Sequence, residues 1–358
     1  MQVFLLLAHW FIFHTWVVFW GNANPGVTEG LRVALLVLAF SFMSAALLSF
    51  RFHNPVVMAL YKVAAVWLGF LNFFFWASCL CWLVRFGMLA FGIDGGQRTT
   101  AIILFSLGFA AGIYGLINAR WIRLRRIAVK LPNLPASWRG RTALLLSDLH
   151  LGHINGMRFI DRLIGRAKNL NPDVIFLPGD LFDGGKIDAD HLAMPFSRLS
   201  PPYGVYFSTG NHDEFGNVKH YSAALERAGV RVLNNERTVA DGLQIVGVSY
   251  HESNFPPRFR ALLDGFKLAA GGASILLNHV PNRLPIAEQA GVSLQLSGHT
   301  HGGQIVPFTW LTRRVFGKFT YGLHSFGSLL VYTSSGAGTW GPPMRVGTHP
   351  EMVLLTFE

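Results

Sequence analysis

Charged side chains are scarce in this chain of 358 residues, at 14% against roughly 25% in a soluble globular protein. The scarcity is confined to the first third. Residues 1–121 contain six of the 30 basic residues and two of the 19 acidic ones, which leaves 24 basic and 17 acidic residues for 122–358. We therefore expect a membrane domain over residues 1–121 and a globular domain with a core of its own over residues 122–358.

Cysteine is also nearly absent. The only two cysteines, Cys79 and Cys81, lie one residue apart inside an apolar run. This spacing suits neither a structural disulfide nor a complete metal site, so a small disulfide-stabilised fold is excluded. The hydrophobic content of 51% excludes intrinsic disorder.

Four apolar stretches in the first third are long enough, or nearly so, to cross a bilayer as helices, which takes about 20 residues each. They cover residues 3–20, 31–50, 56–84 and 100–119. The first stretch has no basic flank and no small-residue cleavage site, so we interpret it as a retained span and not as a signal peptide. His9 and His14 lie within it, and we expect both to be structural because no neighbouring residue completes a site.

Lysine and arginine near the ends of the spans predict the orientation in the membrane. The side of the two termini carries Arg51, Arg120, Arg123, Arg125, Arg126 and Lys130, and the other side carries Arg32, Arg85 and Arg98. This bias predicts an inner-membrane protein whose globular domain is cytoplasmic. One alternative is open for the first set, because the alternation over residues 122–131 also fits the solvated face of a β-strand.

Short apolar runs alternate with helical periodicity after Pro135. The runs predict buried strands at residues 142–147, 174–177, 205–209, 244–248, 274–278 and 293–297. Apolar residues at i, i+3 and i+4 spacing predict helices over 159–167 and 218–228, the second one ending before Gly229. The alternation predicts an α/β fold whose sheets are covered by helices on their outer faces.

Five of the predicted strands end, within about two residues, in side chains that can bind metal. These side chains are Asp148 and His150, Asp180, Asn211 with His212, His279, and His299 with His301. Residues i and i+2 of an extended chain point the same way, so Asp148 with His150, and His299 with His301, can serve one cavity. Because the carboxyl ends of strands are where α/β folds bind ligands, we expect one site.

The motifs resemble those of calcineurin-like metallophosphoesterases: Ser147-Asp-Leu-His-Leu-Gly152, Gly179-Asp180, Gly210-Asn-His-Asp213, Asn278-His279 and Gly298-His-Thr-His-Gly-Gly-Gln304. The extension Gly302-Gly303-Gln304 and a closing pattern from Ser335 to Glu351 are similar to a membrane-associated bacterial subgroup that includes enzymes similar to UDP-2,3-diacylglucosamine hydrolases. The resemblance implies a two-sheet αββα sandwich over residues 122–358, preceded here by a four-helix transmembrane domain.

The resemblance also implies two metal ions. Asp148, His150 and His301 would hold the first ion, Asn211, His279 and His299 would hold the second, and Asp180 would bridge them. Two carboxylates, an amide oxygen and four imidazoles suit Mn²⁺ first, with Fe or Zn²⁺ as alternatives. A water that bridges two such ions becomes a hydroxide near neutral pH and can attack phosphorus.

His212 and Asp183 are the catalytic candidates. The resemblance implies that His212 contacts the phosphate and assists the leaving oxygen, and that Asp183 orients this histidine. An alternative role for Asp183, which the sequence supports equally well, is that of a turn residue before Gly184. Asp213 is expected to cap the helix that follows it. Protein phosphatases of the superfamily carry Arg where this chain has Gly184, which disfavours a phosphoprotein substrate.

Residues 305–321 mix large apolar side chains with three cations, and two interpretations are open. The apolar side chains either belong to a strand and loop packed in the core, or lie at the headgroup level of a membrane and admit acyl chains beside the metals.

Together these features predict a membrane-tethered hydrolase of a phosphoester or diphosphate in a lipid or nucleotide-lipid precursor. The alternatives are a phosphodiesterase or nuclease acting on a soluble polyanion or nucleotide, and a transport or sensor protein with a regulatory phosphoesterase-like domain. The spans contain few ionisable groups, which disfavours transport. Anionic lipid explains the basic residues after the last span as well as nucleic acid does, so no nucleic-acid partner is expected. The sequence leaves the oligomeric state open.

Overall fold

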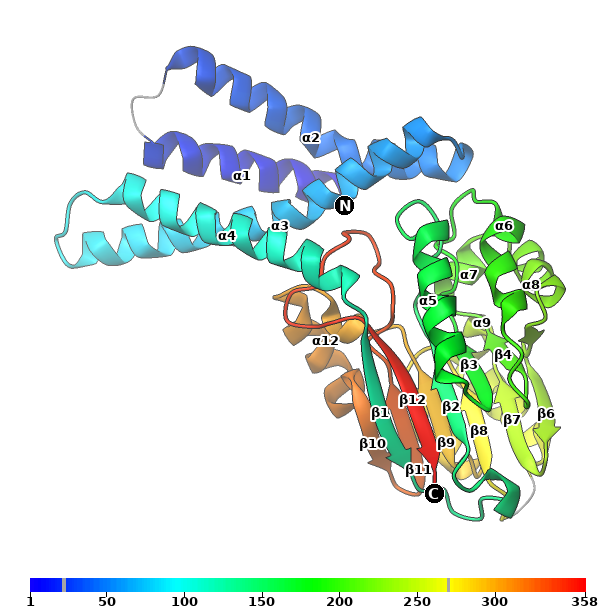
Figure 1. The fold of residues 1–358 in the computed structure, drawn as a ribbon. Helices are drawn as coiled ribbons and strands as arrows, with labels where there is room; N and C mark the ends of the chain where they lie inside the picture. The colour runs from blue at the N-terminus through cyan, green and yellow to red at the C-terminus, as the bar shows by residue number, and fades with distance from the viewer. Residues whose placement is uncertain (21–23, 269–270) are drawn as a thin grey trace. The chain divides into compact units, whose positions relative to one another are not determined.

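The chain consists of two compact units in the computed structural model, which describes residues 1–20, 24–268 and 271–358 (Figure 1). One unit contains residues 1–118 together with 341–346. The other contains residues 119–340 together with 347–358.

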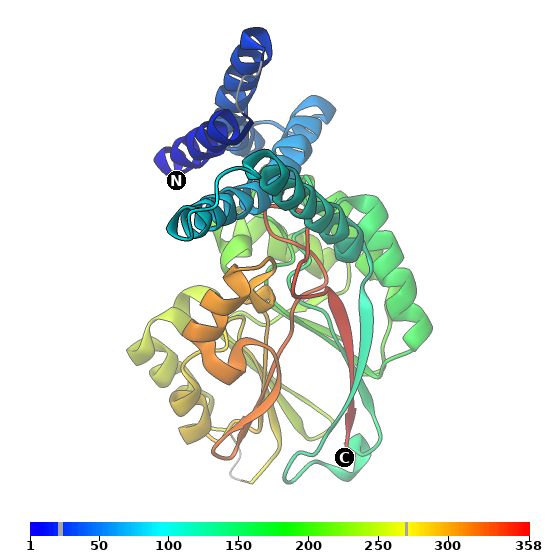
Figure 2. The same cartoon turned by 90° about the vertical axis from the view of Figure 1, so that its left-hand side faces the viewer.

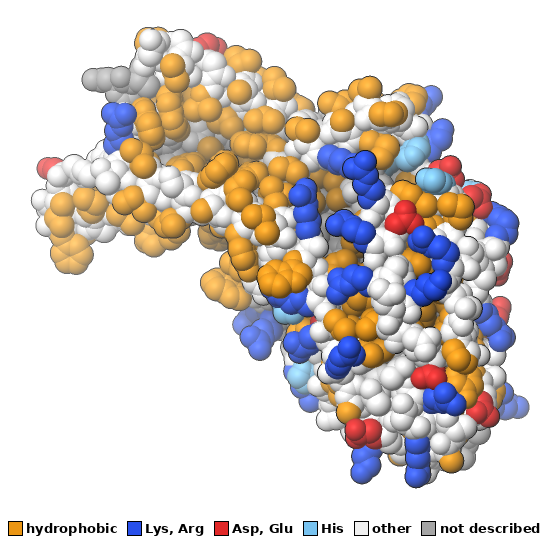
Figure 3. Space-filling view, in the orientation of Figure 1, with side chains coloured by type: hydrophobic (Ala, Val, Ile, Leu, Met, Phe, Trp, Pro, Cys, Tyr) orange, Lys and Arg blue, Asp and Glu red, His pale blue; other side chains and the backbone are white. Residues whose placement is uncertain are grey.

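Four long apolar helices form most of the first unit. They are α1 (Gln2–Trp20), α2 (Pro25–Arg51), α3 (Pro55–Ala90) and α4 (Gln97–Arg120). By length and composition all four can cross a bilayer, and each contains one of the predicted spans. Large apolar side chains such as Phe4, Leu36 and Leu83 are exposed on their outer faces (Figure 3). So much exposed apolar surface is expected of helices that face lipid.

His9 and His14 are satisfied by contacts within the helices. His9 Nδ1 lies 2.7 Å from the carbonyl oxygen of Leu5, and its Nε2 accepts a hydrogen bond from Trp67 Nε1 at 2.8 Å. The His14 ring stacks on Trp10 and Trp82 with centroid distances of 5.4 and 5.6 Å. These contacts agree with the structural role expected for both histidines.

A short segment from far along the chain, residues 341–346, packs with α3 and α4. Met344 is buried, and a Cβ on Gly69 of α3 would lie 2.5 Å from its Sδ. The backbone N–H of Arg345 donates to the carbonyl of Gly115, and Asn118 Nδ2 donates to the carbonyl of Arg345 at 2.9 Å. The absence of a side chain at Gly69 therefore makes room for a segment that hydrogen bonds fix to α4.

The second unit is a sandwich of two six-stranded sheets. The first has the strand order β1-β12-β2-β3-β4-β5 and the second has the order β10-β11-β9-β8-β7-β6. Neighbouring strands are parallel except in the pairs β12–β2, β10–β11 and β6–β7. The strands are β1 (Arg123–Val129), β2 (Thr142–Leu145), β3 (Val174–Pro178), β4 (Val205–Ser208), β5 (Arg231–Val232), β6 (Glu236–Ala240), β7 (Leu243–Gly247), β8 (Ser274–Leu277), β9 (Leu294–Ser297), β10 (Gly322–Phe326), β11 (Leu329–Thr333) and β12 (Glu351–Phe357).

Helices cover both outer faces of the sandwich (Figure 2). The first sheet is covered by α5 (Met157–Leu170), α6 (Ala189–Ala193) and α8 (Val218–Arg227), and the second by α10 (Pro256–Phe266) and α11 (Leu284–Gln289). Alternate strand residues serve the two faces, so Leu144 and Ile175 meet the helices while Leu145 and Phe176 meet the opposite sheet. The predicted αββα sandwich, preceded by four apolar helices, is confirmed.

The other short helices are α7 (Asn211–Phe215), α9 (Tyr250–Asn254) and α12 (Phe308–Phe316), with 3₁₀ turns at Ala136–Trp138, Met194–Arg198, His301–Gly303 and Gly317–Thr320.

Two sequence alternatives are decided by the fold. Residues 123–129 form β1, an edge strand paired with β12, so the arginines that follow α4 belong to a strand of the sandwich. For residues 308–316 the strand-and-loop interpretation is wrong, because Pro307 and Gly317 bound the helix α12, in which no residue is buried. The flanking Ile305 is buried and Phe319 packs against the core, as that interpretation expected. Gly317 has φ +56, which ends the helix.

Candidate metal centre

The predicted ligands meet where the two sheets end. Asp148 and His150 follow β2, Asp180 follows β3, and Asn211 opens α7 just after β4, all in the first sheet. His279 follows β8, and His299 with His301 follows β9, in the second sheet. Because these strands are parallel within each sheet, their carboxyl ends lie on the same edge.

The donor atoms of the cluster lie within a few ångströms of one another. His150 Nε2 is 3.0 Å from His301 Nε2, which is 3.5 Å from Asp148 Oδ1. Asp180 Oδ2 is 3.1 Å from His279 Nε2 and 3.8 Å from His150 Nε2. Each of three groups has its donor atoms within 4.8 Å: Asp148, His150 and His301; His150, Asp180 and His212; Asp180, His279 and His299. Asn211 Oδ1 lies 2.9 Å from His299 Nδ1, so the structure brings all seven predicted ligands together.

The backbone has the same strained, left-handed conformation at several positions in the cluster. Five of the seven candidate ligands have a left-handed φ, which L-residues rarely adopt: Asp148 (54°), His150 (46°), Asp180 (53°), His299 (68°) and His301 (49°). Such strain costs of order 1–3 kcal/mol at each residue and persists where the surroundings fix it, typically at functional sites. A Cβ on Gly210 would overlap Asp180 Oδ1, and one on Gly298 would overlap Asp148 Oδ2, so only glycine allows these loops to approach so closely.

Asp213 corrects one expectation. It does not cap α8, the helix that follows, because Asn217 does so by accepting from the backbone N–H of His220. Asp213 belongs to the capping box of α7, the helix that contains it, by accepting from the N–H of Gly210. The buried Asp213 carboxylate accepts from the N–H groups of Asp180, Phe182 and Gly210 at 2.7, 2.9 and 2.8 Å. It thus holds the Asp180 loop against the loop after β4. Its only sequence signal was its position beside a ligand, in the motif Gly210-Asn-His-Asp213.

His212 and Asp183 lie at the edge of the cluster, and neither side chain is completely buried. His212 Nδ1 is 3.6 Å from Asp183 Oδ1 and 3.4 Å from the Asp183 carbonyl oxygen. Asp183 Oδ1 is also 3.3 Å from His150 Nδ1, so the carboxylate reaches two rings. A Cβ on Gly184 would lie 2.8 Å from the carbonyl of His212, which explains why a larger residue is absent there.

Charge and burial compete in the cluster. Burial lowers the pKa of His279, but the carboxylate of Asp180 outweighs it and raises that pKa to about 10. Burial raises the pKa of Asp180, but the charge of His279 outweighs it and holds that pKa far below its usual range. Burial, together with the charge of His279, lowers the pKa of His299 to about 3. Burial and the charge of Asp180 raise the pKa of Asp213 to about 7. The cluster therefore favours an anionic Asp180 with positive charge close to it.

Residues from Ser335 to Glu351 hold the loop after β2, which contains the candidate ligand Asp148. Glu351 is buried and its carboxylate accepts from Tyr321, Tyr332, Ser334 and the N–H of Ser335. The loop that follows Ser335 donates from Ala337 N to Ser147 O at 3.0 Å and from Gly338 N to Asp148 O at 2.9 Å. The Gln304 side chain then holds the backbone of Trp340 through two hydrogen bonds of 2.8 and 2.9 Å.

Four aromatic rings border the cluster, and one of them is Tyr250, whose ring centroid is 6.5 Å from that of His299. Phe215 and Trp340 lie beside His212, with ring centroids 5.6 and 5.9 Å from its ring, and both are exposed. Phe316, at the end of α12, lies 6.2 Å from the ring of His299. Apolar surface therefore adjoins the polar cluster.

Comparisons with known proteins agree with this geometry. Residues 142–303 match the model of the calcineurin-like phosphoesterase family. The chain is 30% identical over 262 residues to the uncharacterized metallophosphoesterase YkuE of Bacillus subtilis, a match that covers 70% of this chain and 91% of that protein. This chain belongs to the calcineurin-like metallophosphoesterases. The matched segment contains all seven candidate ligands of the metallophosphoesterase.

Two other relatives extend the comparison beyond that segment. A transmembrane protein with metallophosphoesterase domain from Danio rerio is 32% identical over 282 residues, which cover 74% of this chain and 64% of that protein. An uncharacterized metallophosphoesterase of Campylobacter jejuni is 31% identical over 255 residues, covering 69% and 66%. This metallophosphoesterase thus spans slightly less than two thirds of the length of these two relatives.

Proposed function

We propose that the protein is a membrane-tethered phosphohydrolase that uses two divalent metal ions to cleave a phosphoester or diphosphate bond in a lipid or nucleotide-lipid precursor. The observation that carries the proposal is the set of donor groups that overlap at Asp180 and His150. A single ion with seven protein ligands would have no open position for a substrate, whereas two ions sharing Asp180 would.

The donor set fits such a pair of ions. Asp148, His150 and His301 would hold one ion, and Asn211, His279 and His299 the other, with Asp180 shared. His279 Nε2 is buried 3.1 Å from Asp180 Oδ2, and the Nε2 atoms of His150 and His301 converge at 3.0 Å. Nitrogen atoms that converge in this way suit a common cation, and the mixture of imidazole and carboxylate favours Mn²⁺, Fe or Zn²⁺ over Ca²⁺.

The chain's own residues have separable tasks in hydrolysis. When bound, two divalent ions would neutralise charge on the phosphoryl group and lower the pKa of a water shared between them. Asp213 fixes the backbone of Asp180, and Asp180 Oδ1 accepts from the N–H of His212 at 2.8 Å. His212 lies close to Asp183 through Nδ1, which leaves Nε2 to give a proton to the leaving oxygen.

The lipid part of the proposal is supported by the apolar surroundings of the site. The exposed rings of Phe215 and Trp340 adjoin His212, the group proposed to face the leaving oxygen. A substrate that carries apolar chains next to its phosphate would cover these rings. We further propose that residues 1–121 anchor the enzyme in the inner membrane and that the catalytic domain, residues 122–358, faces the cytoplasm.

A substrate panel tests the proposal. The full chain, purified in detergent with Mn²⁺, would be assayed on nucleotide-diphosphate lipids, phospholipids, soluble nucleotides and chromogenic mono- and diesters. We expect metal-dependent turnover with kcat/KM at least tenfold higher for a lipid than for its deacylated counterpart, and no turnover by Asp180→Ala. Faster hydrolysis of soluble nucleotides or polynucleotides than of any lipid would contradict the lipid assignment.

A further inference from the structure

Helix α12 carries an apolar stripe that faces outward. Phe308, Leu311 and Val315, at i, i+3 and i+7, form one stripe with exposed fractions of 52%, 61% and 66%. Thr309, Thr312 and Phe316 are the less exposed side chains of the same helix. Trp310, which precedes Arg313 and Arg314 by three and four residues, is 73% exposed on their side of the helix. A helix that turns its apolar stripe outward needs an apolar partner.

The charge around α12 is of one sign. Arg313, Arg314 and Lys318 follow one another along this segment, and in the part of the chain that the structure describes none of them has a carboxylate within 4.0 Å. The sequence contains no aspartate or glutamate from residue 289 to residue 350. The partner of this segment is therefore both apolar and anionic.

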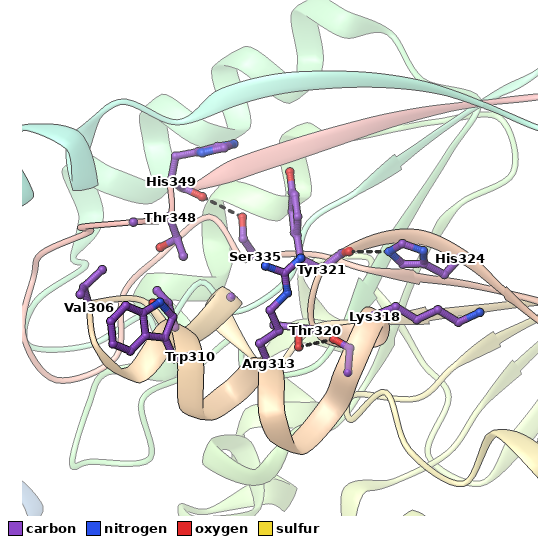
Figure 4. A pocket seen from close by; sticks show the side chains of 14 residues that line it. Val306, Trp310, Arg313, Lys318, Thr320, Tyr321, His324, Ser335, Thr348 and His349 are labelled. Atoms are coloured by element: carbon purple, nitrogen blue, oxygen red, sulfur yellow. Dashed lines mark hydrogen bonds between the residues drawn. The ribbon is translucent and has the colours of Figure 1, made fainter.

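A cavity of about 530 Å³ lies on the basic side of the helix (Figure 4). Arg313 extends into it from α12, and Lys318, Tyr321, His324 and His349 also line it. Val306 and Trp310 add apolar surface to the wall of the cavity. The cavity therefore combines basic side chains that can bind an anionic group with apolar side chains that can contact hydrocarbon.

The chain itself identifies the partner. Helix α4 ends at Arg120 and β1 begins at Arg123, so only Trp121 and Ile122 connect an apolar span to the sandwich. Two residues reach at most roughly 7 Å when extended. A domain on so short a connection stays beside the bilayer that holds α4, where the local concentration of lipid far exceeds that of any soluble partner.

We propose that α12 is an interfacial helix: the stripe of Phe308, Leu311 and Val315 enters the headgroup region of the bilayer, and the Arg313–Lys318 cavity takes the headgroup of an anionic lipid. The inference rests on the membrane spans proposed above and not on the identity of the substrate. Because Phe316 ends the helix 6.2 Å from the ring of His299, the lipid-facing helix borders the metal centre.

Lipid quenching of site-specific labels tests this assignment. Leu311→Cys and Val315→Cys would each be labelled with an environment-sensitive fluorophore, in the full chain with Cys79→Ser and Cys81→Ala, and reconstituted into vesicles of phosphatidylcholine and phosphatidylglycerol. Val239→Cys, a similarly exposed valine at 55% on β6, is the matched control, since β6 and β10 are opposite edges of one sheet. We expect quenching by spin-labelled lipid to be several-fold stronger at 311 and 315 than at 239.

The cavity is tested with charge variants of the same labelled chain. Arg313→Gln with Lys318→Gln should lower the quenching in phosphatidylglycerol vesicles at least twofold, whereas Arg158→Gln with Lys168→Gln on α5 should leave it unchanged. Equal quenching at 311, 315 and 239 would overturn the interfacial helix, and equal losses from both charge pairs would overturn the headgroup site. If the labels at 311 and 315 are shielded from water in detergent, and the unlabelled cysteines at these positions form cross-links between two chains, the stripe packs against a second copy of the protein instead. Hydrolysis of a soluble chromogenic ester by the same samples reports the proposed function separately.

Discussion

At the scale of single residues, the centre separates groups that would hold metal from groups that would act on the substrate. Asp180 belongs to two donor groups, receives the backbone N–H of His212, and is itself held by Asp213. His212 lies at the edge, close to Asp183 and to exposed aromatic rings. Asp180 is thus central to the architecture of the site. His212 belongs to one donor group, and the proposed function assigns it to the substrate and not to a metal ion.

This separation predicts different consequences for two substitutions. Asp180→Ala should abolish turnover and remove at least one bound metal ion per chain, because it deletes the shared carboxylate. His212→Ala should retain both ions and lower kcat by about 10²- to 10⁴-fold, the usual contribution of a general acid. Elemental analysis of the two purified variants, beside steady-state kinetics, measures both effects. Loss of metal from His212→Ala equal to that from Asp180→Ala would show that the proposed division of roles is wrong.

At the scale of elements, the site depends on loops held by distant parts of the chain. The segment 341–346 packs with α3 and α4, and it follows directly on Trp340, whose backbone Gln304 holds and whose ring lies beside His212. The position of that aromatic ring is therefore linked through the chain to the packing of Met344 against Gly69.

The linkage predicts that a change within α3 alters catalysis. Gly69→Leu would displace Met344 and with it the segment after Trp340, so we expect kcat/KM for a lipid substrate to fall at least fivefold with the metal content unchanged. Gly87→Leu on the same helix is the matched control, because a Cβ there meets nothing within 4 Å. Kinetics and elemental analysis of both variants measure the effect. Equal activity of the two variants would mean that the packing of Met344 has no influence on the site.

Sequence reasoning predicted the elements with strong local patterns and missed those made by distant contacts. The strands at 142–147 and 174–177 correspond to β2 and β3, and the donors that follow them converge because the strands are parallel. The function of Asp213 depends on the N–H groups of Asp180 and Phe182, which are 33 and 31 residues away in the chain. Likewise, the contact of Met344 with Gly69 joins segments with no shared local pattern, and α12 carries its apolar side outward, against the usual rule.

At the scale of the whole molecule, a sandwich with its own core follows α4 after two residues, and the chain returns to the helical unit with residues 341–346. The positive charge that follows α4 lies largely on β1, where Arg125 stacks on Tyr321 and is 4.0 Å from Glu351. These arginines therefore belong to the sandwich, whichever way the spans are oriented.

The proposed orientation has a direct test. Reporter fusions at Glu358 and near Gly95, on opposite sides of α4, should be active in the cytoplasm and the periplasm, respectively. We expect this result because basic residues remain concentrated after Arg120. A reporter at Glu358 that is active only in the periplasm would reverse the topology and move the substrate to the outer leaflet.

The central claim is that seven side chains hold two metal ions that act together on a phosphoester, and a metal titration tests it most directly. Metal-free full-length protein would be titrated with Mn²⁺ while hydrolysis of a chromogenic phosphodiester and bound metal are followed in the same samples. The account predicts no turnover without metal and activity that saturates at two ions per chain, because donors overlapping at Asp180 suit a pair of ions. Full activity in metal-free protein, or saturation at a single ion per chain, would contradict it.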